Sequence, residues 1–495
     1  MNNRSCGVLM HITSLPSPYG IGTLGKTAER FADWLKSAGQ SWWQVLPIGP
    51  TGYGDSPYQP FSSFAGNPLM IDLDELCEQK LLGKADCENA DYGADPSFVD
   101  YEKISATRKE LLRKAFSRFV DDVGYTSFIR EEADWLDDYA LFTALKDKFG
   151  GKPWTAWDED IKSRAPSAME KYKEELKDEI RFVKWCQYIF FRQWNRLHSY
   201  CKSKGIGIIG DIPIYVSPDC SDVWASPELF ELDEKLCPKR IAGVPPDYFS
   251  ATGQLWGNPL YNWTEMKRTG YDWWIKRVKK SAQLYDMLRI DHFRAFDTYY
   301  AIPFGHKTAE HGTWENGPGM DLFNAIKAQL GNVNIIAEDL GDIFDSVKKL
   351  LADSGFPGMR VVQFGFNPEN ADNDHLLHNY PKNSVCYTGT HDNATITQWL
   401  KETDAKSAKM AKNYLRKGLF ERFSDCAIRN AYASQSFLCV IQMQDILGLG
   451  KSARMNLPST LSKDNWSWRM QPNMLKPKHA ERLHELAETY MRLKK

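Results

Sequence analysis

The residues best suited to chemistry lie in the stretch 287–296 (MLRIDHFRAF), where Arg289 and Asp291 are two positions apart. In a strand, side chains two positions apart point to the same face. A neighbouring guanidinium favours the ionised form of a carboxyl group and lowers its pKa. An anionic carboxylate held in this way can act as a nucleophile on a sugar. A structural ion pair is the alternative, so the interpretation depends on what the other strands carry.

Several predicted strands end in acidic residues, which are Asp211, Asp291, Glu338 and Asp392. Carboxyl groups gathered in one pocket cannot all ionise freely, so at least one has a raised pKa. One ionised and one protonated carboxyl group are what retaining cleavage of a glycosidic bond requires. Asp291, beside Arg289, is the expected nucleophile. Glu338 follows an apolar run without an adjacent cation and is the expected acid, and later the base. His391 and Asp392 are expected to hydrogen-bond sugar hydroxyls.

The elements that position these residues are eight short apolar segments, mostly separated by helical stretches. The segments are 7–12, 41–47, 205–216, 287–293, 334–341, 359–366, 384–392 and 437–445. Buried strands that alternate with helices and carry polar groups at their carboxyl ends predict an α/β fold, a (β/α)8 TIM barrel. Because the carboxyl ends of barrel strands meet at one mouth, the four acids should meet there too.

Two segments interrupt this alternation within a single catalytic domain that spans 1–495. Residues 70–180 predict a mainly helical insertion after the second strand, with charged, helix-forming stretches. Residues 217–270 are rich in Trp, Pro and Tyr and predict a loop insertion after the third strand. A connection of this length usually forms a binding loop or a lid.

Composition excludes several classes of protein. The formal net charge of −2 provides no field to attract nucleic acid or an anionic membrane surface. No apolar run is long enough for a membrane helix, and the first twenty residues lack the apolar core of a signal peptide. The ten cysteines are scattered without a C-x-x-C pair, which indicates free thiols in a reducing compartment. A cytoplasmic location is therefore expected.

Cofactor and metal patterns are incomplete. The sequence GIGTLG at 20–25 matches a dinucleotide-binding pattern, but a Pro-rich turn separates it from the preceding strand and no acidic residue ends the next one. An acid cluster could also bind magnesium, although no phosphate-binding glycine loop accompanies it. The histidines near 306–311 and 375–378 lack a full set of ligands and indicate polar loops. No cofactor and no metal are expected.

Longer motifs carry a close resemblance to a known family. They are HITSLPSPYGIG (11–22), YGDSPYQPFSSFAGNP (53–68), GDIPIYV (210–216), GVPPDYFSATGQLWGNPLY (243–261), LRIDHFRAF (288–296), AEDLG (337–341), GTHDN (389–393), RMNLP (454–458) and NWSWR (465–469). The sequence resembles, nearly end to end, the 4-α-glucanotransferases of the amylomaltase or disproportionating-enzyme kind, glycoside hydrolase family 77.

The resemblance implies Asp291 as nucleophile, Glu338 as acid and base, and Asp392 as the carboxylate that stabilises the transition state. It also implies a set of substrate-binding residues, which are Ser56, Tyr58, Asp211, Gln254, Trp256, Arg289, His292, His391 and Asn465. Tyr58 would be a stacking platform, and Gln254 and Trp256 would lie on a lid over the acceptor side. Ser459 departs from the family pattern, which has glycine there, and a turn that needs positive φ would be affected.

The expected activity is transfer of an α-1,4-glucan segment from malto-oligosaccharides, starch or glycogen to the 4-hydroxyl of glucose or another glucan. Two alternatives are a glucan hydrolase of the same architecture and a non-catalytic glucan-binding protein. A dinucleotide-dependent oxidoreductase is a more distant alternative. Transfer needs water to be kept from the intermediate, for which residues 243–259 are the candidate lid.

Overall fold

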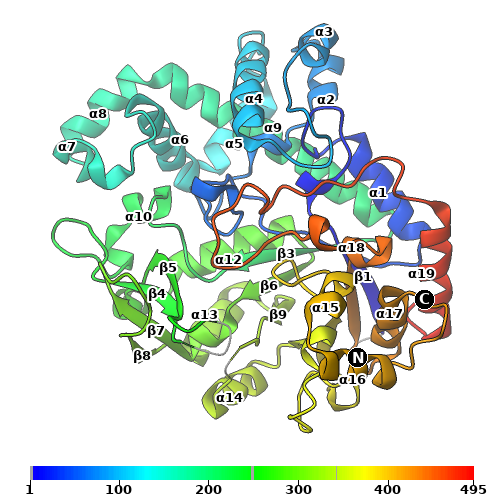
Figure 1. Ribbon diagram of the computed structural model, residues 1–495. Coiled ribbons are helices and arrows are strands. Elements are labelled where there is room, and N and C mark those ends of the chain that lie inside the picture. Colours follow the sequence, from blue (N-terminus) through cyan, green and yellow to red (C-terminus); the bar gives the residue numbers. More distant parts are fainter. Residues whose placement is uncertain (1–3, 247–249, 342, 495) are drawn as a thin grey trace.

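A closed barrel of eight parallel strands forms the centre of the molecule, with strand order β1-β12-β11-β10-β9-β6-β3-β2. The computed structural model describes residues 4–246, 250–341 and 343–494. The barrel strands are β1 (Ser5–Leu9), β2 (Trp42–Gln44), β3 (Gly207–Pro213), β6 (Met287–Asp291), β9 (Ile335–Ala337), β10 (Gly358–Val361), β11 (Ser384–Tyr387) and β12 (Leu438–Gln442). Each of the eight predicted segments overlaps one of these strands, so the predicted (β/α)8 barrel is confirmed (Figure 1).

The strands are shorter than the sequence suggested because their polar ends leave the sheet. The predicted segment 334–341, for example, is a strand only over Ile335–Ala337, all three of which are buried. Glu338 and Asp339 follow immediately and belong to the mouth of the barrel. In this segment the apolar half makes the barrel wall, and the polar half belongs to the mouth.

Helices surround the barrel. Those in the first half are α1 (Lys26–Ser37), α2 (Leu73–Glu78), α3 (Lys84–Glu88), α4 (Tyr101–Phe116), α5 (Val123–Glu131), α6 (Ala133–Lys148), α7 (Glu159–Lys162), α8 (Pro166–Glu175) and α9 (Lys177–Ser203). Those in the second half are α10 (Ser221–Ala225), α11 (Trp263–Arg268), α12 (Asp272–Leu284), α13 (Met320–Leu330), α14 (Asp345–Ser354), α15 (Ile396–Glu402), α16 (Ala405–Tyr414), α17 (Phe423–Ala433), α18 (Met443–Leu447) and α19 (Pro477–Thr489).

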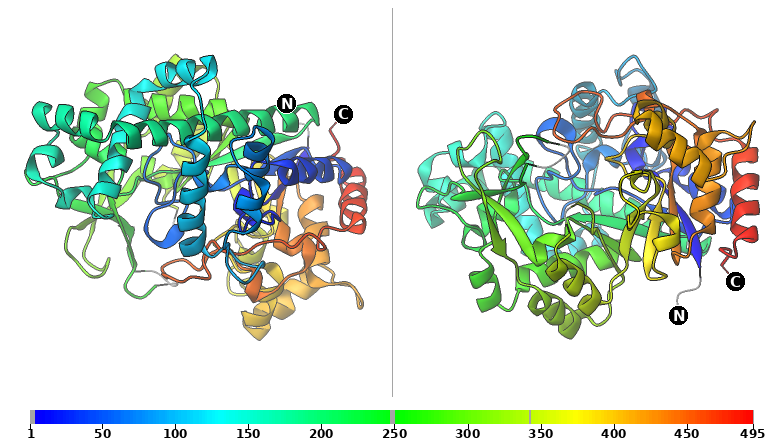
Figure 2. Two further views of the ribbon diagram at one scale, coloured as in Figure 1. Left: turned by 90° about the horizontal axis from the view of Figure 1, so that it is seen from above. Right: turned by 60° about the horizontal axis from the view of Figure 1, so that its bottom comes forward.

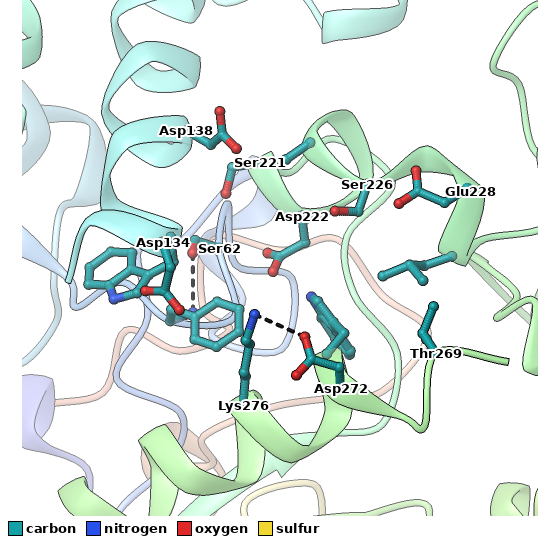
Figure 3. Close-up of a pocket in the computed structure, with 15 residues that line it drawn as sticks. Ser62, Asp134, Asp138, Ser221, Asp222, Ser226, Glu228, Thr269, Asp272 and Lys276 are labelled. Atoms are coloured by element: carbon teal, nitrogen blue, oxygen red, sulfur yellow. Dashed lines mark hydrogen bonds and ion pairs between the residues drawn. The ribbon is translucent and has the colours of Figure 1, made fainter. Parts of the chain in front are cut away.

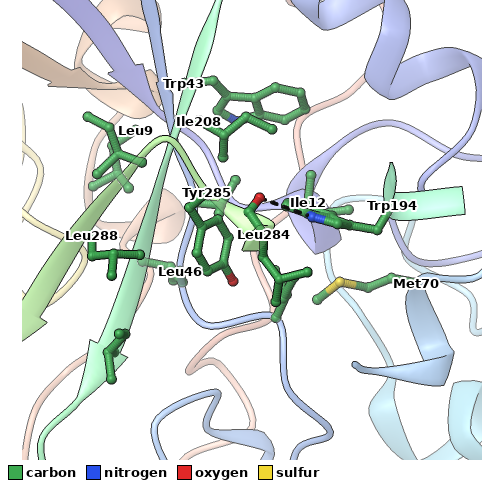
Figure 4. Packing of buried hydrophobic residues seen from close by; sticks show 14 of the residues in the cluster. Leu9, Ile12, Trp43, Leu46, Met70, Trp194, Ile208, Leu284, Tyr285 and Leu288 are labelled. Carbon is green, nitrogen blue, oxygen red and sulfur yellow. Dashed lines mark hydrogen bonds between the residues drawn. The ribbon is translucent and has the colours of Figure 1, made fainter. Parts of the chain in front are cut away.

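Helices α2 to α9 follow β2 and extend to one side of the barrel (Figure 1). Aromatic contacts join the members of this group. Trp135 on α6 meets Phe191 on α9 edge to face, with ring centroids 5.9 Å apart. The long helix α9 then returns to the barrel, where its Trp194 indole donates a hydrogen bond to the carbonyl oxygen of Leu284 at 3.2 Å (Figure 4). Insertion and barrel therefore share one continuous core.

A second sheet lies to one side of the barrel, with strand order β5-β4-β7-β8 (Figure 1). Its strands are β4 (Arg240–Val244), β5 (Gln254–Pro259), β7 (Thr298–Pro303) and β8 (Thr313–Asn316). The segment 217–270, which the sequence suggested as loop, therefore contains two strands. They pair with each other, and β4 also pairs with β7, the first strand of a hairpin after β6. The glycines and prolines in this segment hide the alternation that normally identifies a strand.

The two ends of the described chain meet beside β1. The Arg4 guanidinium donates to the carbonyl oxygen of Tyr490 at 3.2 Å, and Arg492 donates to that of Ser5 at 2.9 Å. Helix α19, red in Figure 2, lies beside α1 as a result. No helix of the described ranges is long and apolar enough to cross a membrane.

Candidate active site

One buried arginine links two of the four predicted acids. Strands β3 and β6 are neighbours, and their register places Asp211 opposite Arg289. Arg289 Nη1 donates to both carboxylate oxygens of Asp211, at 2.8 and 2.7 Å, and its Nη2 donates to Asp291 Oδ1 at 2.7 Å. Charge-assisted hydrogen bonds of this kind are short and fix the geometry of both partners. Arg289 therefore orients the Asp291 carboxyl group.

Exposure separates the two acids that share Arg289. The Asp211 side chain is fully buried, whereas that of Asp291 is 29% exposed. A buried carboxylate paired in this way serves to position the arginine, whereas an exposed one can meet a substrate. Asp291 thus has the access to substrate that a nucleophile needs. Asp211 supports Asp291 indirectly, because it holds Arg289 in place.

Glu338 follows β9, the strand that pairs with β6, and therefore lies beside Asp291 in a setting that favours its protonated form. Burial raises the pKa of Glu338 to about 8, and the negative charge of Asp291 adds to the effect. The backbone N–H groups of His292 and Leu340 donate to its two oxygens at 2.7 and 2.9 Å. These bonds oppose the rise without cancelling it and fix the direction of the carboxyl group. At neutral pH Glu338 can therefore donate a proton.

The backbone at His292 makes this contact possible. His292 has a φ of 54°, in the left-handed region that non-glycine residues rarely adopt. The turn comes directly after β6 and aims the His292 N–H at Glu338. Burial and the charge of Arg294 lower the pKa of the His292 imidazole to about 3, so the ring is neutral beside the acids.

Asp392 has the opposite electrostatic character. Its pKa falls to about 2, because His391 and a hydrogen bond from Asn456 outweigh the effect of burial. The Asn456 amide donates to Asp392 Oδ1 at 2.7 Å, and His391 Nε2 lies 3.3 Å from Oδ2. The side chain is 41% exposed. Asp392 is thus a permanently charged carboxylate open to a ligand.

An aromatic platform stands beside these acids. The Tyr58 hydroxyl donates to Asp211 Oδ2 at 2.9 Å and lies 3.3 Å from His391 Nδ1. The rings of Tyr58 and His391 stack at 4.8 Å, and Trp466 lies 5.7 Å from Tyr58 and 5.8 Å from His391. The loop with Tyr58 follows β2, and Ser56 Oγ holds it by accepting the Tyr58 N–H at 3.2 Å. Aromatic rings can pack on the apolar face of a sugar, and the carboxylates beside them can accept hydrogen bonds from its hydroxyl groups.

The second sheet brings two further predicted residues to the mouth. On β5, Trp256 Nε1 donates to Gln254 Oε1 at 3.1 Å. The Trp256 ring meets that of His292 edge to face at 4.8 Å. This contact places β5 directly beside the strand that carries Asp291.

Asn465 is placed differently from the other predicted residues. Its Oδ1 accepts the Leu457 N–H at 3.0 Å, and its amide donates to the carbonyl oxygen and hydroxyl of Thr460 at 3.0 and 3.1 Å. The side chain therefore closes its own loop, and a contact with sugar stays a prediction. Ser459 in this loop has a φ of 61°, so the position does adopt the conformation for which glycine is suited.

Sequence reasoning missed three residues of the site, which are Arg454, Asn456 and Trp466. Arg454 donates to the carbonyl oxygens of Asp392 and Asn456 at 2.6 and 2.7 Å, so it ties the 454–456 segment to the β11 loop. All three lie in the motifs RMNLP and NWSWR. Because these motifs lie outside the predicted strands, the sequence did not predict that they reach the barrel mouth.

Replacement of Asn456 by alanine tests the positioning of Asp392. Loss of a hydrogen bond to a charged group costs about 1.5–3 kcal/mol, so we expect kcat to fall by roughly tenfold to a hundredfold. The KM should change little, because Asn456 acts through Asp392. Initial rates of glucose release from maltotriose measure the effect. Asn413→Ala, at an exposed position on α16, is the matched control, and an equal loss there would contradict the role.

Metal-binding groups are absent from the described ranges: no three His, Cys, Asp or Glu side chains there lie close enough to hold an ion. His375 instead accepts the Val361 N–H through Nδ1 at 3.1 Å. His306 and His311 face one another edge to face, with centroids 6.3 Å apart. Each of the ten cysteines is a free thiol.

A (β/α)8 barrel with neighbouring carboxyl groups and an aromatic platform at its mouth is the arrangement of an enzyme of the glycoside-hydrolase type. The model of glycoside hydrolase family 77, described as 4-α-glucanotransferase, matches residues 10–475, and the chain belongs to this family. It is therefore an enzyme acting on α-1,4-glucans, a 4-α-glucanotransferase.

Known relatives agree over the whole length. The 4-α-glucanotransferase of Clostridium butyricum is 47% identical over 487 residues, which cover 98% of this chain and 100% of the relative. That of Streptococcus pneumoniae serotype 4 is 48% identical over 500 residues, which cover 100% and 98%. The structure of the amylomaltase from Streptococcus agalactiae in complex with acarbose has a TM-score of 0.97 at 42% identity, covering 99% of this chain and 100% of the other.

Proposed function

We propose that this enzyme transfers glucan segments by a retaining double displacement, with Asp291, Glu338 and Asp392 in the three catalytic roles. The observation that carries the proposal is the different setting of two neighbouring acids. Arg289 Nη2 donates to Asp291 Oδ1 at 2.7 Å, whereas burial raises the pKa of Glu338 to about 8. A nucleophile and a proton donor therefore coexist at one pH.

In the first step the Asp291 carboxylate attacks the anomeric carbon of the donor. The glycosidic bond breaks, and Glu338 gives its proton to the departing 4-oxygen. Positive charge develops on the sugar ring, which the Asp392 carboxylate stabilises from nearby. The donor segment is then a glycosyl ester of Asp291, and the remainder of the donor leaves with a free 4-hydroxyl.

In the second step the ester makes Asp291 neutral. The Asp291 charge, which adds to the effect of burial on Glu338, is then gone, so the pKa of Glu338 falls and the carboxyl group can act as a base. Glu338 removes the proton of an acceptor 4-hydroxyl, whose oxygen attacks the anomeric carbon and releases Asp291. Two inversions give net retention.

The polar residues around the acids have supporting roles in this proposal. Tyr58 and His391 stack and offer a face to the reacting sugar, while Asp211 fixes Arg289. Gln254 and Trp256 on β5 cover the acceptor side and exclude water from the ester. Ser56 and Asn465 hold the loops that flank the mouth.

Donors and acceptors in this proposal are malto-oligosaccharides and starch- or glycogen-type glucans, with glucose as acceptor and product. No step of the mechanism needs a cofactor, a metal, nucleic acid or a membrane. We propose a cytoplasmic location, because a reducing compartment keeps cysteines as free thiols and can also hold storage glucans.

Incubation of the purified enzyme with maltotriose tests the proposal. Transfer gives glucose together with a ladder of longer malto-oligosaccharides, which chromatographic sizing separates. Glucose and maltose alone would instead identify a hydrolase. Saturable glucan binding without turnover would identify a non-catalytic glucan-binding protein.

A further inference from the structure

A hollow of about 250 Å³ lies away from the carboxylate mouth, between α6, α10 and the first turn of α12 (Figure 3). None of its 15 lining residues is among the residues assigned above to the active site. We call it the outer pocket and define it by Phe64, Trp135 and Trp273 on its aromatic side and by Asp134, Asp222 and Glu228 on its polar side. Its volume exceeds the roughly 150 Å³ of a cavity that binds benzene, so it has room for one pyranose ring.

Aromatic rings form two walls of the outer pocket. Phe64 stacks on Trp135 at 6.3 Å with an angle of 19° between the ring planes. Trp273 meets Phe64 at 6.3 Å with an angle of 89°. Phe64 and Trp273 are only half-buried, so they keep ring surface open to the hollow. Two perpendicular aromatic surfaces offer contact to the C–H face and the edge of a sugar ring.

Polar groups occupy the opposite side and the rim. Asp222 is 6% exposed, and its Oδ2 accepts the Ser63 N–H at 2.8 Å. Asp134 and Glu228 are exposed at the rim, and Lys276 pairs with Asp272 at 2.9 Å (Figure 3). Carboxylates accept hydrogen bonds from hydroxyl groups, and the excess of negative charge disfavours anions such as phosphates. The groups present therefore suit a neutral ligand rich in hydroxyls.

We propose that the outer pocket binds a glucose unit of an α-glucan and is a second carbohydrate site of this enzyme. The proposal rests on the proposed function, because the donor and acceptor would be the glucans that supply the ligand. Phe64 belongs to the loop after β2 that also carries Tyr58, so both sites share one segment. A long glucan held at the outer pocket would have a raised effective concentration at the mouth. A chain of three glucose units cannot profit in the same way.

Binding of maltoheptaose to an Asp291→Asn enzyme, which cannot turn it over, tests this proposal by calorimetry. We expect two classes of site. In an Asp291→Asn background, Asp134→Ala with Glu228→Ala should weaken the second class by roughly tenfold and leave the first unchanged. Both residues are exposed, so this pair should not disturb the fold, and Phe64→Ala provides a second, stronger disruption. Glu481→Ala with Glu485→Ala, exposed on α19, is the matched control.

Kinetics give an independent readout in the otherwise unchanged enzyme. The Asp134→Ala, Glu228→Ala enzyme should show a KM for amylose raised by roughly tenfold, with kcat and KM for maltotriose unchanged. A single class of site, or a second class that the pocket variants leave intact, would overturn the proposal. The proposal would also be overturned if calorimetry showed that the outer pocket binds spermidine, a cationic probe, but does not bind maltose. Failure of the proposed function would appear separately, as absence of transfer from maltotriose by the unmodified enzyme.

Discussion

Replacement of Asp291 by alanine should reduce transfer from maltotriose by about 10⁴- to 10⁶-fold, the range seen when a covalent nucleophile is lost. The reason is that the glycosyl ester cannot form, while Arg289 loses one of its two carboxylate partners. Binding of glucan should persist, because the aromatic platform of Tyr58, His391 and Trp466 stays in place. Rates of glucose release and sizing of the products measure both effects.

The space that Asp291→Ala leaves allows a second test of the nucleophile. A small anion such as azide can enter beside Arg289 and attack the anomeric carbon, which should restore cleavage and yield a glycosyl azide of inverted configuration. Asp345→Ala, at a fully exposed aspartate on α14, should be as active as the unmodified enzyme. Substantial transfer by Asp291→Ala without any added anion would assign the nucleophile elsewhere.

The barrel could be predicted from the sequence because its strands are short apolar runs. Strand β12, Leu438–Gln442, is buried along its whole length, and such a strand needs no alternation to be recognised. The acids could be predicted for a related reason. An acid that ends an apolar run stands out, and the geometry of a barrel sends all such ends to one mouth. The spacing of Arg289 and Asp291 in β6 predicted that they share a face, and only the acids at the ends of the other strands favoured a catalytic role over a structural ion pair.

The second sheet could not be predicted in the same way, because its strands pair over long distances. Strand β4 pairs with β5 and also with β7, which comes after the catalytic strand β6. Local propensity carries no information about such partners, and tertiary context overrides it. Trp256 reached the site only through this pairing, which brings its ring against His292.

Side-chain contacts between distant segments, such as those of Asp392, could not be predicted from the sequence either. Asn456 is 64 residues from Asp392 and lies in a segment without regular secondary structure. Nothing in its sequence neighbourhood indicates that its amide meets a carboxylate. The left-handed turn at His292, which directs an N–H to Glu338, could not be predicted either, because positive φ is uncommon even for histidine, which is enriched there.

Replacement of Glu338 by glutamine should lower kcat for maltotriose by about 10²- to 10⁴-fold, the usual contribution of general acid–base catalysis. Glutamine keeps the shape, but its single carbonyl oxygen can accept only one of the two N–H groups of His292 and Leu340, so the loss would combine the missing proton with one lost hydrogen bond. The first step needs protonated Glu338, whose pKa lies at about 8. Activity of the unmodified enzyme should therefore fall as the pH rises through about 8, and this limb should be absent in Glu338→Gln.

A donor that needs no proton separates acid catalysis from damage to the site. With α-maltosyl fluoride the leaving group departs as fluoride, so Glu338→Gln should form the ester on Asp291 nearly as fast as the unmodified enzyme. Release to an acceptor should then be slow, because the base is missing, and the ester should accumulate to a mass detectable on the protein. Since Asp291 raises the pKa of Glu338, Asp291→Asn should lower that pKa, which carbon NMR of the carboxyl group measures. An unchanged pKa would mean that burial alone keeps the proton on Glu338, and the switch from acid to base would then need another cause.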